Sequence, residues 1–87
     1  KMDPYRIIRY PLATEKSVRT MEMENKLILI VYLKSNKQQI KEAVEQAFSV
    51  KVVKVNTLIT STGLKKAYVK LSTDTPAIDV ATQLGLI

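Results

Sequence analysis

The sequence contains neither cysteine nor histidine, and both absences narrow the chemistry open to it. Without cysteine there is no disulfide scaffold, no thiolate metal site and no cysteine nucleophile. Without histidine, the commonest general base and the commonest zinc ligand are missing as well. We therefore expect no metal, no cofactor and no small-molecule substrate.

Glycine is almost as scarce, since Gly63 and Gly85 are the only two. They form neither a phosphate-cradling loop nor a dinucleotide-binding pattern. Eight carboxylates are present, but none is paired at a spacing that helix capping or a solvated face would not explain equally well. The sequence thus predicts no catalytic residues and a protein that is not an enzyme.

Long apolar runs are absent too. The longest, from Leu27 to Leu33, is far shorter than the roughly 20 residues needed to cross a bilayer. The segment Lys1–Pro4 lacks the apolar core of a signal peptide. We expect no membrane insertion, a reducing cytoplasmic setting, and a single domain over residues 1–87.

Positive charge is what the sequence has in excess. Lys and Arg number 14 against eight Asp and Glu, which gives a net charge of +6 and a pI near 9.7. This charge on a small domain favours polyanionic partners. A charge that serves only solubility is the alternative, and charge alone does not separate RNA from DNA or from an anionic membrane.

The pattern of apolar residues predicts an α+β fold with the order β-α-β-α-β-β-α and a mainly antiparallel sheet. Lys26–Leu33 is apolar at both odd and even positions, so both of its faces should be covered and helices should pack on both faces of the sheet. The predicted strands are 5–10, 26–33, 50–59 and 65–72, and the predicted helices are 14–23, 37–48 and 76–84.

Capping residues mark the predicted helix starts. Thr14 can cap the first helix, and Asn36 with Gln39 resembles a capping box for the second. Thr75 is the predicted cap of the third helix, with Pro76 at its first position. The first helix is predicted to end at Asn25 and the last at Gly85. The predicted inward face of the last helix consists of Ile78, Ala81 and Leu84. A strand bulge is predicted at Val52–Val53.

A basic strand face is the best candidate site. Along the predicted strand 65–72, Lys66, Tyr68 and Lys70 share one face, about 6.6 Å apart. Lysines neutralise phosphates, and a tyrosine between them offers a ring on which a base can stack. The alternative is an ordinary solvated face in which Tyr68 packs under the last helix.

Further polar residues flank this strand. Lys51 and Lys54 come from the neighbouring strand, where Asn56 and Thr57 either donate to phosphates and base edges or form local turn bonds.

A second basic group, formed by Arg6, Arg9 and Lys16, lies beside the start of the first predicted helix. It either holds a phosphate or is a solvated helix end. The helix dipole alone explains Glu15 in the first turn.

Three stretches together resemble a known family. Lys65–Ser72 followed by Val80 is similar to the signature of the large-subunit ribosomal protein twenty-three family, whose members lie at the polypeptide exit tunnel. Arg9–Lys16 and Phe48–Thr57 resemble two further segments of that family. The resemblance extends from about Arg6 to Val80.

This resemblance implies a ribosomal protein in the cytoplasm that binds large-subunit rRNA and contacts neighbouring ribosomal proteins. It also implies a docking surface for nascent-chain factors, in which Glu15 matches the docking glutamate. The positions that it implies for rRNA binding are Lys51, Asn56, Thr57, Lys65, Lys66 and Tyr68, with Arg9 and Lys16 as helpers; the strand pattern adds Lys70.

One departure from the bacterial pattern concerns the loop before the last strand. The connection Thr60–Leu64 is short, as in archaeal-type members, so we expect no tunnel-lining role. Signal recognition particle is then the expected partner rather than trigger factor.

Two other functions remain open. A free-standing ferredoxin-like module that binds single-stranded RNA would need two or three exposed aromatic residues, and only Tyr68 and Tyr32 qualify. A small phosphate-handling enzyme would need a glycine loop that the sequence lacks.

Overall fold

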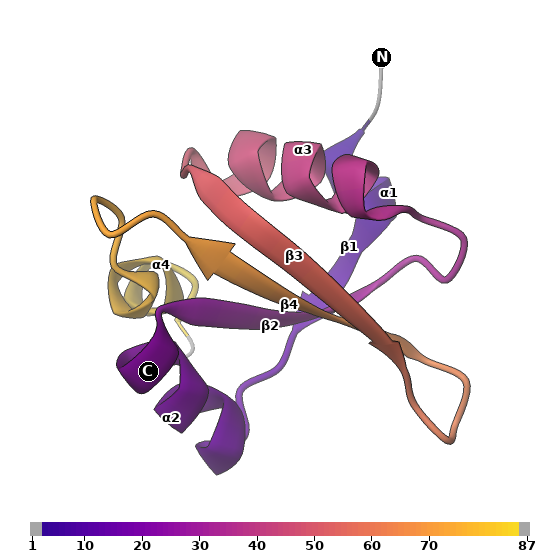
Figure 1. Cartoon of the computed structure of the whole chain (residues 1–87), viewed down its shortest axis with the longest axis horizontal. Coiled ribbons are helices and arrows are strands. Elements are labelled where there is room, and N and C mark those ends of the chain that lie inside the picture. The colour runs from indigo at the N-terminus through magenta and orange to yellow at the C-terminus, as the bar shows by residue number, and fades with distance from the viewer. Residues whose placement is uncertain (1–2, 86–87) are drawn as a thin grey trace.

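The computed structural model describes residues 3–85. Four strands form one sheet in the order β1-β2-β4-β3, and every neighbouring pair is antiparallel. The predicted α+β class and order are confirmed, with one short helix added before the first strand. The elements are α1 (Pro4–Ile7), β1 (Ile8–Pro11), α2 (Glu15–Glu24), β2 (Lys26–Val31), α3 (Lys37–Phe48), β3 (Val52–Ile59), β4 (Lys65–Leu71) and α4 (Ala77–Gln83) (Figure 1).

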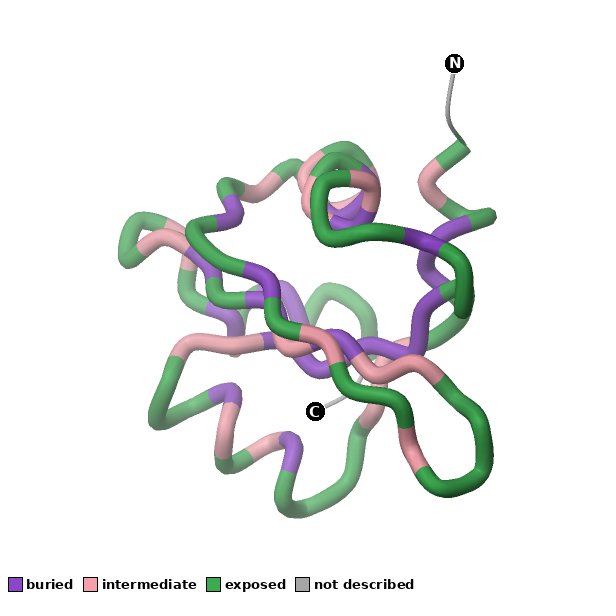
Figure 2. The backbone as a smooth tube through the Cα atoms, turned by 45° about the vertical axis from the view of Figure 1, so that its right-hand side comes forward, coloured by how far each residue is buried: buried purple, intermediate pink, exposed green. Residues whose placement is uncertain are grey.

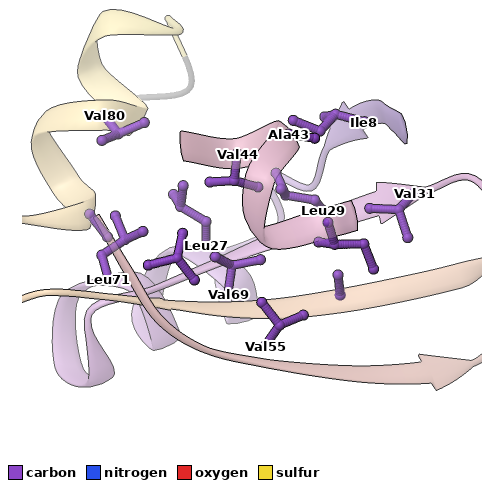
Figure 3. Close-up of a cluster of buried hydrophobic side chains, with 14 of the residues drawn as sticks. Ile8, Leu27, Leu29, Val31, Ala43, Val44, Val55, Val69, Leu71 and Val80 are labelled. Carbon is purple, nitrogen blue, oxygen red and sulfur yellow. The ribbon is translucent and has the colours of Figure 1, made fainter. Parts of the chain in front are cut away.

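The main core lies between one face of the sheet and helices α3 and α4. On this core face, Leu27 and Leu29 of β2 are opposite Val69 and Ala67 of β4. Figure 3 shows these strands presenting their side chains toward Val44 of α3 and toward α4. Burying such branched side chains stabilises the fold by roughly 1.5–3 kcal/mol each, as an upper estimate.

The second face of the sheet is covered only in part. Ile28 and Ile30 of β2 point away from the main core, yet both are buried. Helix α2 lies on the opposite side of the sheet from α3 and packs against β2 (Figures 1 and 2). The prediction that both faces of the second strand are covered is therefore confirmed. On β3 and β4 the same face carries mostly polar residues, with the exposed Leu58 beside them.

Local signals account for α3. The Asn36 side chain accepts from the Gln39 N–H at 2.8 Å, and the Gln39 side chain accepts from the Asn36 N–H at 3.0 Å. This is the predicted capping box. The helix buries Ile40, Ala43 and Val44 and passes into a left-handed residue, Ser49.

The predicted first strand is wrong over its first half. Residues 5–7 belong to α1, because the Asp3 carboxylate accepts from the Tyr5 N–H at 3.0 Å and Pro4 occupies the first turn. Asp followed by Pro is a helix start, since proline lacks the amide that a first turn leaves unpaired. The strand begins only at Ile8 and includes Pro11.

The predicted start of the last helix is also wrong. Thr75 does not cap α4; Pro76 stands at the cap position without a side-chain hydrogen bond. Instead the Asn25 side-chain oxygen accepts from the Ala77 N–H at 2.6 Å.

The inward face of α4 differs from the prediction as well. It consists of Ala77, Val80 and Ala81, whereas Ile78 is half-buried and Leu84 is 39% exposed.

Strand ends differ by a few residues from the predicted ranges. The second strand ends at Val31 rather than Leu33, and the third begins at Val52. The pairing of β3 with β4 shifts between Val52 and Lys54, and Val53 between them is 62% exposed. The bulge predicted at Val52–Val53 is thus confirmed.

Candidate nucleic-acid interface

The predicted basic row lies on β4, on the face opposite the core. Lys66, Tyr68 and Lys70 alternate with Ala67 and Val69, which are completely buried. Lys66 Nζ lies 5.9 Å from the centroid of the Tyr68 ring, within the range of a cation–π contact. Lys70 is exposed, and the other two side chains are half-buried.

Strand β3 extends this surface. Lys54, Asn56 and Leu58 are exposed and are opposite Lys70, Tyr68 and Lys66, respectively. Ammonium groups, an amide and an aromatic ring are the side chains that bind phosphates and unstacked bases. We call this surface the open face; it consists of Lys54, Asn56, Leu58, Lys66, Tyr68 and Lys70.

The strand register adds a residue that the sequence analysis missed. Lys26, the first residue of β2, is opposite Lys70, so Lys26, Lys70 and Lys54 form a row across three adjacent strands. We call these three the lysine row. Lys26 Nζ lies 3.1 Å from a Glu24 carboxylate oxygen. No local pattern in the sequence indicates this row, because it depends on the pairing of residues far apart in the chain.

Two of the expected rRNA-binding residues lie on the other side of the sheet. Thr57 is opposite Ala67 and Lys65 is opposite Val31, which places both on the side of the core face, toward the hairpin end. The Lys65 ammonium donates a hydrogen bond to the Ser35 carbonyl oxygen in the loop before α3. The predicted site residues therefore divide between two surfaces.

The remaining basic positions come from other elements. Lys51 is exposed just before β3, where its carbonyl oxygen accepts from the Ser72 N–H at 2.9 Å. Arg9 is exposed in β1, where the register with β2 shifts, and Lys16 is exposed in the first turn of α2. Arg9 and Lys16 are therefore not part of the β3–β4 hairpin.

Glu15 begins α2 and points into solvent. Thr14 caps this helix as predicted, because its Oγ1 accepts from the Ser17 N–H at 3.1 Å. A Glu15 oxygen lies 2.9 Å from the guanidinium of Arg19 one turn later, and the Glu15 side chain is 83% exposed. The position thus presents a weakly paired carboxylate at the surface.

Within residues 3–85, acidic side chains do not gather in groups of three that would hold a metal ion. In the same part of the chain, no helix has both the length and the apolar character required to cross a bilayer.

Comparison with known proteins gives two findings. The family model described as ribosomal protein L23 matches residues 6–63. The protein named large ribosomal subunit protein uL23 from Trypanosoma brucei brucei is 49% identical over 87 residues. That match covers all of this chain and 53% of the relative, so the chain spans about half the length of the curated relative.

Proposed function

Because this chain belongs to the ribosomal protein L23 family, we propose that it binds large-subunit rRNA as a structural part of the large ribosomal subunit beside the polypeptide exit tunnel. The family consists of structural ribosomal proteins and implies a place on cytoplasmic ribosomes; we propose no catalytic activity. The observation that carries the proposal is the open face, whose lysines make no ion pair within residues 3–85.

The open face offers two kinds of contact to RNA. Lys66 and Lys70 would neutralise phosphates and release condensed counterions. Tyr68 would stack on an unpaired base, and Asn56 beside it would donate to a base edge or a 2′-hydroxyl.

The other proposed contacts surround this face. Lys65 and Thr57 would contact rRNA from the opposite side of the hairpin, so that the RNA encloses both faces of it. Lys51 would extend the charge beyond the start of β3, and Arg9 and Lys16 would bind a separate RNA segment.

The start of α2 is the proposed docking surface for factors that meet the nascent chain. Glu15 is exposed there and is held only by Arg19. Such an exposed pair on a helix contributes about 0.3–0.5 kcal/mol, so a basic group of a partner can displace it. Signal recognition particle is the proposed partner, and neighbouring ribosomal proteins would surround the rest of the domain.

A free-standing module for single-stranded RNA is the weaker proposal. Such modules stack bases on aromatic residues of central strands. Here one of the two central strands, β2, presents the buried residues Ile28 and Ile30 on that face, and only the other, β4, carries an aromatic residue there, Tyr68. Tyr32 lies beyond the end of β2 rather than on the sheet.

The test is binding of the 87-residue chain to deproteinised large-subunit rRNA over a range of salt concentrations. We expect the affinity to fall steeply with salt, and Lys66→Gln to reduce the slope by about 0.7 log units per log unit of salt. Tyr68→Leu should weaken binding without changing the slope, because it removes stacking but no charge.

The matched control is Lys37→Gln, which removes a lysine from the start of α3 on the other side of the sheet. It should change the affinity and the slope less than Lys66→Gln does. An affinity independent of salt, or an equal loss with Lys37→Gln, would contradict rRNA binding through the open face.

A further inference from the structure

We propose that the lysine row is one phosphate-binding site, in which neighbouring ammonium groups share a single phosphate of an RNA backbone that crosses the strands. The inference rests on the proposed function, since it names which backbone group the protein holds and where. It differs from binding along β4 because the three lysines come from three strands.

The spacing of the lysines favours a shared phosphate. Residues directly opposite on antiparallel strands have Cβ atoms about 5 Å apart, so the long side chains of Lys54 and Lys70 can converge on one anion. Lys66 and Lys70 are separated by four residues of one strand, about 13 Å. They are too far apart to neutralise the same phosphate, and each would bind its own.

Without a bound anion, repulsion within the lysine row destabilises the folded sheet. Like charges directly opposite one another destabilise a sheet. Within residues 3–85, neither Lys54 nor Lys70 has a carboxylate close enough to form an ion pair. The register therefore concentrates positive charge that the fold itself does not neutralise, as expected for a site whose counter-charge comes from outside.

Lys26 differs from Lys54 and Lys70 because it already pairs with a carboxylate of the chain, Glu24. Its ammonium lies 3.1 Å from a Glu24 oxygen, and its side chain is only 24% exposed. The Glu24 side chain is 54% exposed, so solvent weakens this pair. Glu24 thus partly neutralises Lys26, and Lys54 and Lys70 form the principal part of the site.

The lysine row lies next to Tyr68 on the same face of the sheet. Tyr68 precedes Lys70 by two residues on the same face, a separation of about 6.6 Å. A nucleotide whose phosphate is held by Lys54 and Lys70 can therefore direct its base toward the Tyr68 ring. The row thereby sets the direction of the backbone, and the tyrosine takes an adjacent base.

The experiment compares salt slopes for binding to deproteinised large-subunit rRNA. If Lys54 and Lys70 share a phosphate, either substitution by Gln alone leaves it neutralised and changes the slope little. The double variant K54Q/K70Q should lose about 0.7 log units per log unit of salt, more than the sum of the single changes. The control pair, K66Q and K70Q, should be additive because those lysines are far apart.

Glu24→Gln supplies a second readout. It frees Lys26, so rRNA affinity should rise at low salt, whereas Glu42→Gln on α3 should have a smaller effect. Additive slopes for K54Q and K70Q, or no gain with Glu24→Gln, would overturn the shared site while leaving rRNA binding intact. A wild-type chain that does not bind rRNA would instead overturn the proposed function.

Discussion

Asn25 joins three parts of the molecule through one side chain. It ends α2 in the left-handed conformation, with φ of 56°. Its side-chain nitrogen lies 3.1–3.3 Å from the carbonyl oxygens of Leu71, Ser72 and Thr75, and its oxygen accepts from the first amide of α4. Asn at a left-handed position is common, but its contacts here depend on tertiary structure.

Replacing Asn25 by glycine separates its side-chain bonds from its backbone conformation. Glycine tolerates positive φ, so Asn25→Gly removes the hydrogen bonds without straining the folded backbone, and it also increases the freedom of the unfolded chain. We expect a loss of about 2–4 kcal/mol in the free energy of unfolding, measured with urea, and faster amide exchange at Ala77. A loss below about 1 kcal/mol would show that water replaces the side chain.

The comparison Asn25→Asp tests the donors separately. Aspartate keeps an acceptor for the Ala77 amide, but it places a charged oxygen beside three carbonyl oxygens. This variant should be at least as destabilised as Asn25→Gly.

Among the elements, those defined by local signals were predicted well. Helix α3 has its cap, its apolar stripe and its end within one continuous segment, and the Val52–Val53 bulge followed from broken alternation. The start of α4 could not be predicted from local sequence, because the residue that caps it, Asn25, lies more than 50 positions away in the chain. The start at Asp3–Pro4 was a local signal that apolar residues after it obscured.

The α3 capping box gives an element-scale prediction. Asn36→Ala removes the acceptor for the Gln39 amide and should lower the free energy of unfolding by about 1 kcal/mol in urea titrations. Asn36→Ser keeps a capping oxygen and should retain most of the stability. Equal losses for the two variants would assign the effect to packing instead of capping.

The candidate site could be predicted only in part for the same reason. Alternation within β4 correctly grouped Lys66, Tyr68 and Lys70 on one face. Alternation alone did not show that Thr57 and Lys65 lie on the other face of the sheet, or that Lys26 lies on this one. These placements follow from the register among three strands. Which of these residues contact rRNA stays a prediction.

At the scale of the whole molecule, a net charge of +6 and the lysine row couple stability to ionic strength. Self-repulsion destabilises the compact state, and salt screens it. We therefore expect the Tm to rise between low and moderate salt. At low salt, K54Q should raise the unfolding free energy by about 0.5 kcal/mol, or roughly 2–4 °C for a domain of this size.

Thermal unfolding followed by circular dichroism at low and high salt checks this expectation. Lys37→Gln serves as the control, because that lysine has no lysine opposite it on a strand. The gain with K54Q should disappear at high salt. A gain that persists there would indicate better packing rather than relieved repulsion.

The two outer strands of the sheet are both irregular. Strand β1 has only four residues, a register shift after Ile8 and a proline at its end. Strand β3 carries the bulge at Val53 followed by Lys54. Edge strands that are irregular, charged or contain proline resist the addition of further strands. At the proposed location beside emerging, still unfolded polypeptides, these irregularities would therefore make both edge strands poorer templates for strand addition.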